Sequence, residues 1–248
     1  MRKDAQSAIA VKNLQKSFGK QRVLNGIDLE VEQGETVAVL GRSGTGKSVL
    51  LKLIVGLQQP DSGSVRIHGQ EITSLRMEEL NKVRKSIGFL FQDGALYDSL
   101  TLEENVLFPL RQNRTSEHEQ RDRARELLSQ VGMEKDFNKL PSQISGGMKK
   151  RAGLARALAL DPDILLFDEP TSGLDPITSS EIEELILKLQ EERKTASIVV
   201  THDMHGAQTV SDRLALIHEG DILIQGSFDD LRKSDDPFVA RFLRESRE

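Results

Sequence analysis

The sequence contains no cysteine, and this absence removes several kinds of chemistry. Without a thiol the chain forms no disulfide, no thiolate metal site and no cysteine nucleophile, a composition that suits a reducing compartment. An excess of basic residues is also missing: the formal net charge is −5 at pH 7, and no basic tract interrupts the chain. Because phosphate contacts supply most nucleic-acid affinity, we expect no nucleic acid among the partners.

Long apolar runs are missing as well. No run approaches the ~18 residues that a helix needs to cross a bilayer, and residues 1–6 have no apolar signal core behind them. We therefore expect the chain to stay in the cytosol unless a partner holds it at a membrane. With 248 residues, 37% hydrophobic and 29% charged, the chain is long enough to bury a sizeable core.

Three segments that are present carry recognisable chemistry. Residues 41–48, GRSGTGKS, fit the G-x-x-x-x-G-K-[ST] phosphate loop. Residues 163–169, DILLFDE, are an apolar strand that ends in two carboxylates. Residues 144–148, ISGGM, lie between these two segments. Together and in this order, the three segments resemble the ATP-binding cassette (ABC) family of transporter ATPases, and the match runs from about residue 8 to about residue 226.

Hydrophobic patterning predicts an α/β fold around these segments. Residues 8–18 and 27–31 alternate apolar and polar side chains, which indicates antiparallel strands. Further along, the expected elements are strands at 36–40, 87–91, 163–167 and 196–201, helices after the glycine loop and at 178–192, and a hairpin around 219–221. Alternation of strands with helices predicts a largely parallel sheet.

A polar helical stretch interrupts this alternation from residue 103 to about residue 140. It predicts an α-helical subdomain, at about 93–160, inserted into the core. A short C-terminal extension is expected at about 227–248. The whole chain, 1–248, is thus expected to be a single ABC ATP-binding domain: a P-loop NTPase core with an antiparallel β subdomain and an inserted α-helical subdomain.

The phosphate loop places backbone N–H groups at a helix N-terminus, where the helix dipole favours negative charge. Lys47 is expected to contact the β- and γ-phosphates of ATP, and Ser48 to ligate Mg²⁺. The candidate ATP-binding residues of the loop are Gly41, Arg42, Ser43, Gly44, Thr45, Gly46, Lys47 and Ser48. The alternative is a chance match in an unrelated turn, and the strand-loop-helix context argues against it.

Two carboxylates follow the strand at 163–167, at the edge where open α/β sheets bind ligands. Asp168 is expected to hold Mg²⁺ through water. Glu169 is expected to polarise the water that attacks the γ-phosphate. Taken alone, the segment is equally well explained by a solvated acidic turn before Pro170.

Ser145, Gly146 and Gly147 begin a helix with a hydroxyl and two exposed N–H groups. Taken alone they are explained by a serine N-cap followed by flexible glycines. The resemblance implies that this signature crosses a head-to-tail homodimer and binds the γ-phosphate of the ATP held by the other copy. Ile144 and Met148 stand where the family more often has Leu and Gln.

The resemblance also implies roles for four further residues. Gln92 would sense the metal and the nucleophilic water, and His202 would hydrogen-bond the γ-phosphate. Asp175 would belong to the loop that communicates between the two sites, and Phe18 would stack on adenine. Each residue also has a plainer explanation: a solvated glutamine, a histidine that closes a strand, a helix start and a core phenylalanine.

Four short blocks of sequence narrow the resemblance to one subfamily of these ATPases. They are FQDGALY at 91–97, NVLFPL at 105–110, SGGM at 145–148 and DPIT at 175–178. They look like the ATPase subunit of Mla-type phospholipid transporters, which work with lipid-binding proteins of the mammalian-cell-entry class. The resemblance implies that residues 92–110 meet an integral membrane permease through an apolar patch that includes Leu96, Tyr97 and Leu100. Packing within the helical subdomain is the alternative for this patch.

The predicted function is therefore ATP hydrolysis, with Mg²⁺, by a homodimer that holds ATP at its interface and powers a separate permease for phospholipid. A transporter for another substrate keeps every site and differs only in its permease. A module for chromosome or ribosome work is disfavoured, because the chain has no long coiled-coil insertion, tandem cassette or basic surface. Glu169 disfavours a regulator that does not hydrolyse ATP.

Overall fold

A computed structural model describes residues 7–111 and 116–245 of the chain. The strands are β1 Ile9–Phe18, β2 Gln21–Val31, β3 Thr36–Leu40, β4 Ser62–Ile67, β5 Gln70–Glu71, β6 Ile87–Leu90, β7 Ile164–Asp168, β8 Ala196–Thr201, β9 Arg213–His218 and β10 Asp221–Gly226. The helices are α1 Lys47–Ile54, α2 Met77–Arg84, α3 Leu102–Leu110, α4 Glu117–Gln130, α5 Gly146–Ala157, α6 Pro176–Arg193, α7 Met204–Val210, α8 Phe228–Arg232 and α9 Pro237–Glu245, with a 3-10 turn at Pro141–Gln143.

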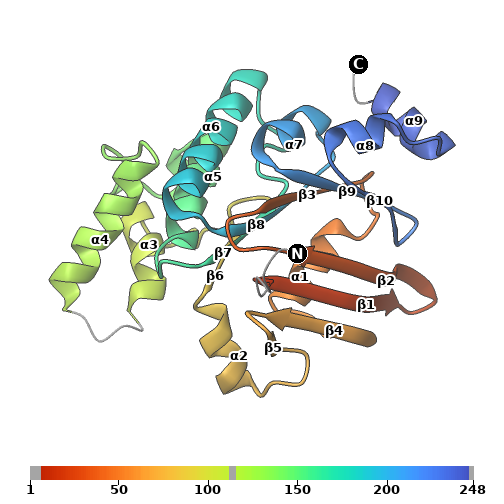
Figure 1. Cartoon of the computed structure of the whole chain (residues 1–248). Coiled ribbons are helices and arrows are strands. Elements are labelled where there is room, and N and C mark those ends of the chain that lie inside the picture. The colour runs from red at the N-terminus through yellow and green to blue at the C-terminus, as the bar shows by residue number, and fades with distance from the viewer. Residues whose placement is uncertain (1–6, 112–115, 246–248) are drawn as a thin grey trace.

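The strands form two sheets (Figure 1). One is antiparallel with the order β2-β1-β4-β5, and the other has six strands in the order β10-β9-β3-β8-β7-β6. In the larger sheet every pairing from β9 to β6 is parallel, and only β10 is antiparallel. The predicted α/β architecture with a separate antiparallel β subdomain is therefore confirmed.

The larger sheet is buried on both faces, because alternate side chains of its strands enter different cores. Val37 and Val39 of β3 share a core with α1 and with the smaller sheet. Ala38 and Leu40 share another with α7, α8 and α9. This two-sided burial explains why the central strands are continuous apolar runs without polar alternation. Helix α1 consequently lies between the two sheets, with the glycine loop at its start.

The carboxyl ends of the parallel strands lie along one edge of the larger sheet, and the candidate site residues follow those ends. Gly41 follows β3, Gln92 comes two residues after β6, Glu169 follows β7, and His202 follows β8. Parallel pairing brings these four distant segments together at the edge where open α/β sheets bind ligands.

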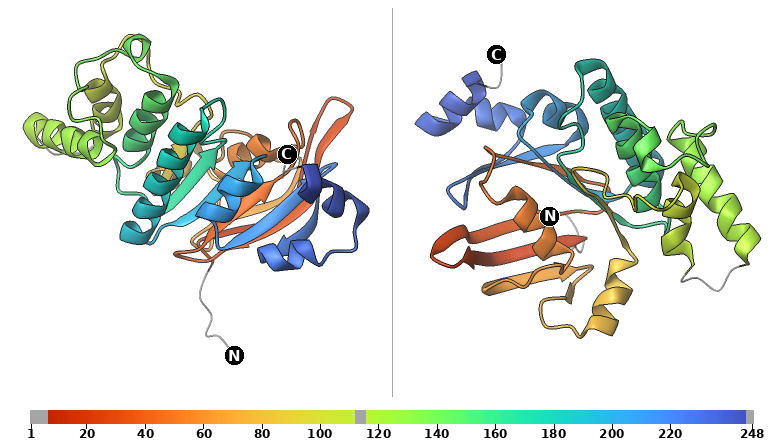
Figure 2. Two further views of the ribbon diagram at one scale, coloured as in Figure 1. Left: turned by 90° about the horizontal axis from the view of Figure 1, so that it is seen from above. Right: turned by 180° about the vertical axis from the view of Figure 1, so that it is seen from behind.

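Helices α3, α4 and α5 pack around a further core at one end of the molecule, opposite α8 and α9 (Figures 1 and 2). The helical stretch expected to reach about residue 140 ends earlier, at Gln130, and residues 131–140 form turns. Gly132 explains the difference: its φ of 74° is left-handed, and the following Met133 N–H donates to the carbonyl of Leu128. This arrangement closes a helix C-terminus. Residues 112–115 lie outside the described part.

Some elements begin earlier than patterning predicted or were not predicted at all. Helix α6 begins at Pro176 instead of 178, because Asp175 caps it and proline is suited to the first helical position. No elements were predicted for β4, β5 and α2, or for the C-terminal extension, which contains α8 and α9.

Across residues 7–111 and 116–245, no helix has both the length and the apolar character needed to cross a bilayer.

Candidate functional site

The glycine loop enters α1 through a conformation that only glycine adopts easily. Gly46 has a φ of 98°, and a Cβ at this position would lie 2.8 Å from a methyl of Val23 and 2.9 Å from one of Leu24. The hydroxyl of Thr45 donates to the carbonyl of Arg42 at 2.9 Å and so fixes the turn. The loop thereby holds its backbone against the N-terminus of α1, which is an anion-binding position.

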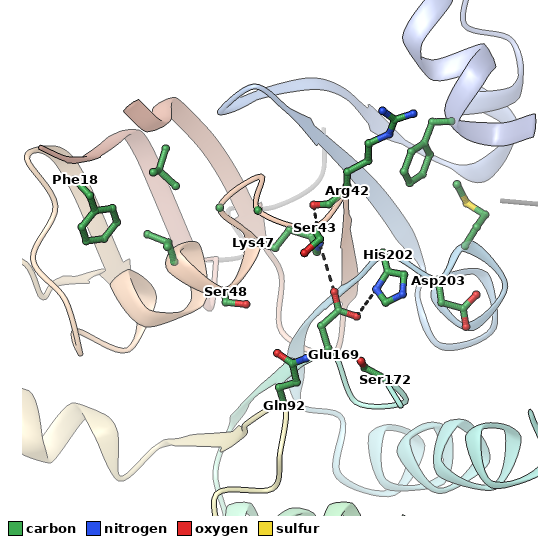
Figure 3. Close-up of a pocket in the computed structure, with 16 residues that line it drawn as sticks. Phe18, Arg42, Ser43, Lys47, Ser48, Gln92, Glu169, Ser172, His202 and Asp203 are labelled. Atoms are coloured by element: carbon green, nitrogen blue, oxygen red, sulfur yellow. Dashed lines mark hydrogen bonds and ion pairs between the residues drawn. The ribbon is translucent and has the colours of Figure 1, made fainter. Parts of the chain in front are cut away.

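Lys47 lies at the centre of a buried group of charges. Its Nζ donates to the carbonyl oxygens of Gly41, at 2.8 Å, and Arg42, at 3.2 Å. The same Nζ lies 3.4 Å from Oε1 of Glu169, as Figure 3 shows. Lys47 is 5% exposed and Glu169 is 8% exposed. Buried charges of this kind require partners, so each one holds the other in position.

Ser48 and Asp168 form a second polar pair beside this group. The Ser48 hydroxyl donates to Oδ1 of Asp168 at 2.7 Å. Burial raises the pKa of Asp168, and the hydrogen bond from Ser48 opposes that shift. A hydroxyl and a carboxylate are hard oxygen ligands of the type that Mg²⁺ binds. The described residues contain no group of three or more His, Cys, Asp or Glu able to hold a metal, so phosphate oxygens and water would complete such a shell.

Glu169 is held by contacts on three sides. Its backbone has a φ of 47°, in the left-handed region, and its N–H donates to the carbonyl of Val200 at 2.9 Å. Oε2 lies 2.9 Å from Nδ1 of His202 and accepts from the hydroxyl of Thr201 at 3.3 Å. Oε1 faces Lys47. One buried carboxylate therefore connects the phosphate loop to the end of β8 (Figure 3).

A cavity of about 880 Å³ joins these groups. Phe18 lines it with 47% of its surface exposed, so the explanation of Phe18 as a core residue is wrong. Gln92 lines it from the loop after β6, next to Glu169 in Figure 3. Gly41 and Thr45 support the glycine loop without lining the cavity, whereas the other six loop residues line it.

Sequence reasoning missed several residues of the cavity wall. They are Val23, Val49, Ser172, Asp203, Met204 and Phe242. Asp203 and Met204 were within reach of sequence reasoning, because they directly follow His202. Phe242 carried no signal: it belongs to α9, which packs onto the larger sheet through contacts distant in sequence.

The signature segment lies apart from this cavity. Within the described residues, nothing between 144 and 148 lines it. Ser145 caps α5, with its hydroxyl oxygen accepting from the N–H of Met148 at 3.3 Å, and both Ser145 and Gly146 are exposed. Gly147 is buried because α5 begins against α6, where a Cβ would collide with a methyl of Thr178.

Asp175 also lies outside the cavity wall. Its carboxylate accepts from the N–H groups of Ile177 and Thr178, both at 3.1 Å, and from the Thr178 hydroxyl at 2.6 Å. These contacts make Asp175 the N-cap of α6, which was the plainer explanation of this residue. The chain thus brings together Phe18, the glycine loop, Gln92, Asp168, Glu169 and His202, but neither the signature nor Asp175.

Comparison with known proteins gives the same family from sequence and from structure. A family model described as ABC transporter matches residues 24–172. A probable ribonucleotide transport ATP-binding protein of Mycobacterium leprae is 44% identical over 97% of this chain and 70% of its own length. A methionine import ATP-binding protein of Enterococcus faecalis is 41% identical over 96% and 70%. An intermembrane phospholipid transport system ATP-binding protein of Haemophilus influenzae is 40% identical over 96% and 91%.

Two solved structures share the fold. A dimeric ATP-binding cassette in a post-hydrolysis state with ADP and phosphate has a TM-score of 0.82 and 36% identity, over 88% of this chain and 98% of its own. The cbiO1 protein of Clostridium perfringens, part of the ABC transporter complex cbiONQ, has a TM-score of 0.83 and 30% identity, over 98% and 97%. The chain belongs to the ABC transporter family, as an ATP-binding subunit that hydrolyses ATP to power transport.

Proposed function

We propose that this chain works as one half of a homodimer that holds ATP and Mg²⁺ at its interface and drives a separate membrane permease for phospholipid. The observation that supports the site most strongly is the run of contacts from Lys47 through Glu169 to His202, beside the pair Ser48 and Asp168. It combines a phosphate-binding cation, a buried carboxylate and a candidate Mg²⁺ ligand, Ser48, in one cavity, with Asp168 hydrogen-bonded to Ser48 behind the cavity wall.

ATP binding uses the two ends of the cavity. The N–H groups of the glycine loop and Nζ of Lys47 hold the phosphates, and the exposed ring of Phe18 stacks on adenine. Mg²⁺ neutralises phosphate charge when it is bound. Ser48 and Asp168 would hold it, and Gln92, which lines the cavity from the loop after β6, would contribute a further oxygen ligand.

Hydrolysis then depends on what Lys47 contacts. A phosphate bound along the loop competes with Glu169 for the Lys47 ammonium, which lies only 3.4 Å from the carboxylate. Once Lys47 turns to phosphate, Glu169 is free to accept a proton from the attacking water. His202, 2.9 Å from Glu169 and 60% exposed in its side chain, is able to orient both the carboxylate and the γ-phosphate.

The position of the signature supports the proposed homodimer. Ser145 and Gly146 are exposed at the start of α5 and do not line the cavity of their own chain. We infer that they close the cavity of a second copy, with Asp175 near the contact between the two sites. The dimeric cassette that shares this fold supports the arrangement.

The permease contact is proposed for the groove between the sheet and the helical subdomain. This cavity of about 440 Å³ includes Phe89, Tyr97, Phe108 and Arg156 in its wall. Tyr97 and Phe108 are exposed, and their ring centroids lie 4.9 Å apart. Leu96 instead packs on the core of the helical subdomain. For Leu96, the alternative of packing within that subdomain therefore applies. The exposed aromatic pair is the more suitable docking surface.

The proposed cargo is argued from the relatives and from the four sequence blocks. The relatives are named for ribonucleotide, methionine and phospholipid transport, and the first two favour a transporter for another substrate. Phospholipid is supported by the four sequence blocks and by the Haemophilus influenzae relative. A lipid-binding protein of the mammalian-cell-entry class then joins the complex, and the chain lies at the cytoplasmic face of the inner membrane.

Reconstitution tests this proposal. The chain is purified from membranes with whatever integral protein accompanies it, and the complex is placed in vesicles. ATP-dependent movement of a fluorescent phospholipid is expected, with the Glu169→Gln complex as the inactive control. Movement of methionine or a ribonucleotide, with phospholipid left in place, contradicts the lipid cargo. Purification without any integral membrane protein contradicts the permease.

A further inference from the structure

A buried lysine outside the cavity wall contacts the backbone of Glu169. Lys150 lies in α5, is 4% exposed, and donates from Nζ to the carbonyl oxygen of Glu169 at 2.8 Å. Within the described residues, no other side chain hydrogen-bonds this oxygen. Burial lowers the pKa of Lys150, while the nearby carboxylates of Asp93, Glu169 and Asp168 raise it.

The Glu169 backbone needs such a restraint. Its φ of 47° is left-handed, a conformation that is unfavourable for a residue with a Cβ. The N–H is fixed by Val200 on β8, and the carbonyl is fixed by Lys150 and by the N–H of Ser172, at 3.2 Å. Because the peptide is held from both sides, the direction of the Glu169 side chain is set by β8 on one side and by α5 on the other.

Helix α5 also holds the loop that contains Gln92. Arg156, near its C-terminus, donates to the carbonyl oxygens of Gly94, at 2.9 Å, and Ala95, at 2.7 Å. Ser145 of the signature caps the start of the same helix. One rigid helix therefore connects the signature to two loops of its own chain, and Lys150 is its connection to Glu169.

We infer that Lys150 is a positioning residue for ATP hydrolysis, which holds the carboxylate of Glu169 toward the attacking water and transmits movement of the signature helix to it. Lys150 does not line the cavity, so it acts through Glu169 and not on the nucleotide. The inference rests on the proposed role of Glu169 as the base.

The test compares variants of the full-length chain in steady-state ATP hydrolysis with Mg²⁺. Lys150→Met removes the donor but keeps the length of the side chain. We expect kcat to fall about tenfold or more, with KM and ATP affinity unchanged, because a small misplacement of a reacting group is costly. Lys150→Arg, which keeps a cationic donor, is expected to recover much of kcat. An unchanged kcat in Lys150→Met, or a loss of affinity equal to the loss of kcat, overturns the inference.

Two controls separate this inference from simpler explanations. Lys149→Met removes a neighbouring charge on α5 whose side chain has no hydrogen bond or ion pair in the described structure, and it should leave kcat unchanged. If Lys150→Met does not fold, Lys150→Leu, which also removes the donor, is measured instead with the same expected outcomes.

A double variant separates the failure of this inference from a failure of the proposed function. If Glu169→Gln alone retains turnover, the base assignment itself is wrong. If Glu169→Gln lowers turnover to a small residual rate, adding Lys150→Met should cause no further loss of that residual rate, because both residues act through one carboxylate. A further loss in the double variant means that Lys150 acts independently of Glu169, and overturns the positioning role.

Discussion

Two helix starts in this chain, those of α1 and α5, have similar local chemistry and very different surroundings. Both begin at glycines with backbone N–H groups available for an anion. At α1, Lys47 is buried and paired with Glu169 inside a cavity. At α5, Ser145 and Gly146 face outward and line no cavity of their own chain. The comparison teaches that the first helix start belongs to a site within the chain, whereas the second is available to another molecule.

The largest effect is expected from a change at Glu169, the proposed base beside the start of α1. Glu169→Gln keeps the shape of the side chain but accepts no proton, so we expect kcat to fall by about 10²- to 10⁴-fold. ATP binding should persist, and ATP-bound dimers should accumulate in light scattering. Glu184→Gln, at an exposed position of α6, is the matched control. Turnover near that of the control would reject Glu169 as the base.

Removal of the cation at the same helix start should weaken binding. Lys47→Ala deletes a loop side chain that combines a positive charge with an ion pair to Glu169. A charge-assisted hydrogen bond contributes about 1.5–3 kcal/mol, so ATP affinity should fall roughly 10- to 100-fold. Equilibrium binding of a fluorescent ATP analogue measures this loss, and Lys188→Ala on the surface of α6 is the control. Unchanged affinity contradicts the phosphate-loop assignment.

The signature should respond differently from the loop. Ser145→Arg places a bulky side chain on an exposed helix start without touching the cavity. We expect ATP affinity of the single chain to remain unchanged, while ATP-dependent dimerisation and turnover fall. A binding titration and light scattering on the same sample separate the two quantities. A loss of affinity in the monomer would mean that α5 serves its own cavity.

The smallest effect on intrinsic hydrolysis is expected at the aromatic pair, which lies outside both helix starts. Tyr97→Glu should leave ATP binding and basal turnover of the chain unchanged, because Tyr97 is not in the nucleotide cavity. Its stimulation by the permease should fall, because a charge enters an apolar docking surface. Stimulation equal to that of the unaltered chain argues against this groove as the contact.

Sequence alone predicted that several of the candidate site residues would lie close together, because they follow the ends of apolar strands. Gly41, Gln92, Glu169 and His202 each come within two residues of such an end, and parallel pairing gathers them. The role of Lys150 was not predicted, because it depends on a contact with Glu169 that no motif encodes.

The helices that were missed share one physical cause. Helix α2 and the C-terminal helices are short, and their stability comes from packing against distant segments more than from their own periodicity. The early end of α4 depended on one left-handed glycine, Gly132, within a charged stretch that otherwise favoured a helix. Where the sequence carries local turn or cap chemistry, as at Asp175, the boundary was in error by only two residues.

The central claim is that the signature of one copy completes the cavity of the other, and a linked dimer tests it most directly. With Lys47→Ala in one copy and Ser145→Arg in the other, one composite site keeps both of its parts. With both changes in the same copy, each site loses one part. In a Glu169→Gln background, the account predicts one ATP trapped at the closed interface, resistant to exchange with free nucleotide, per linked dimer in the first arrangement and none in the second. The reverse pattern, with ATP retained only when both changes share a copy, would contradict it.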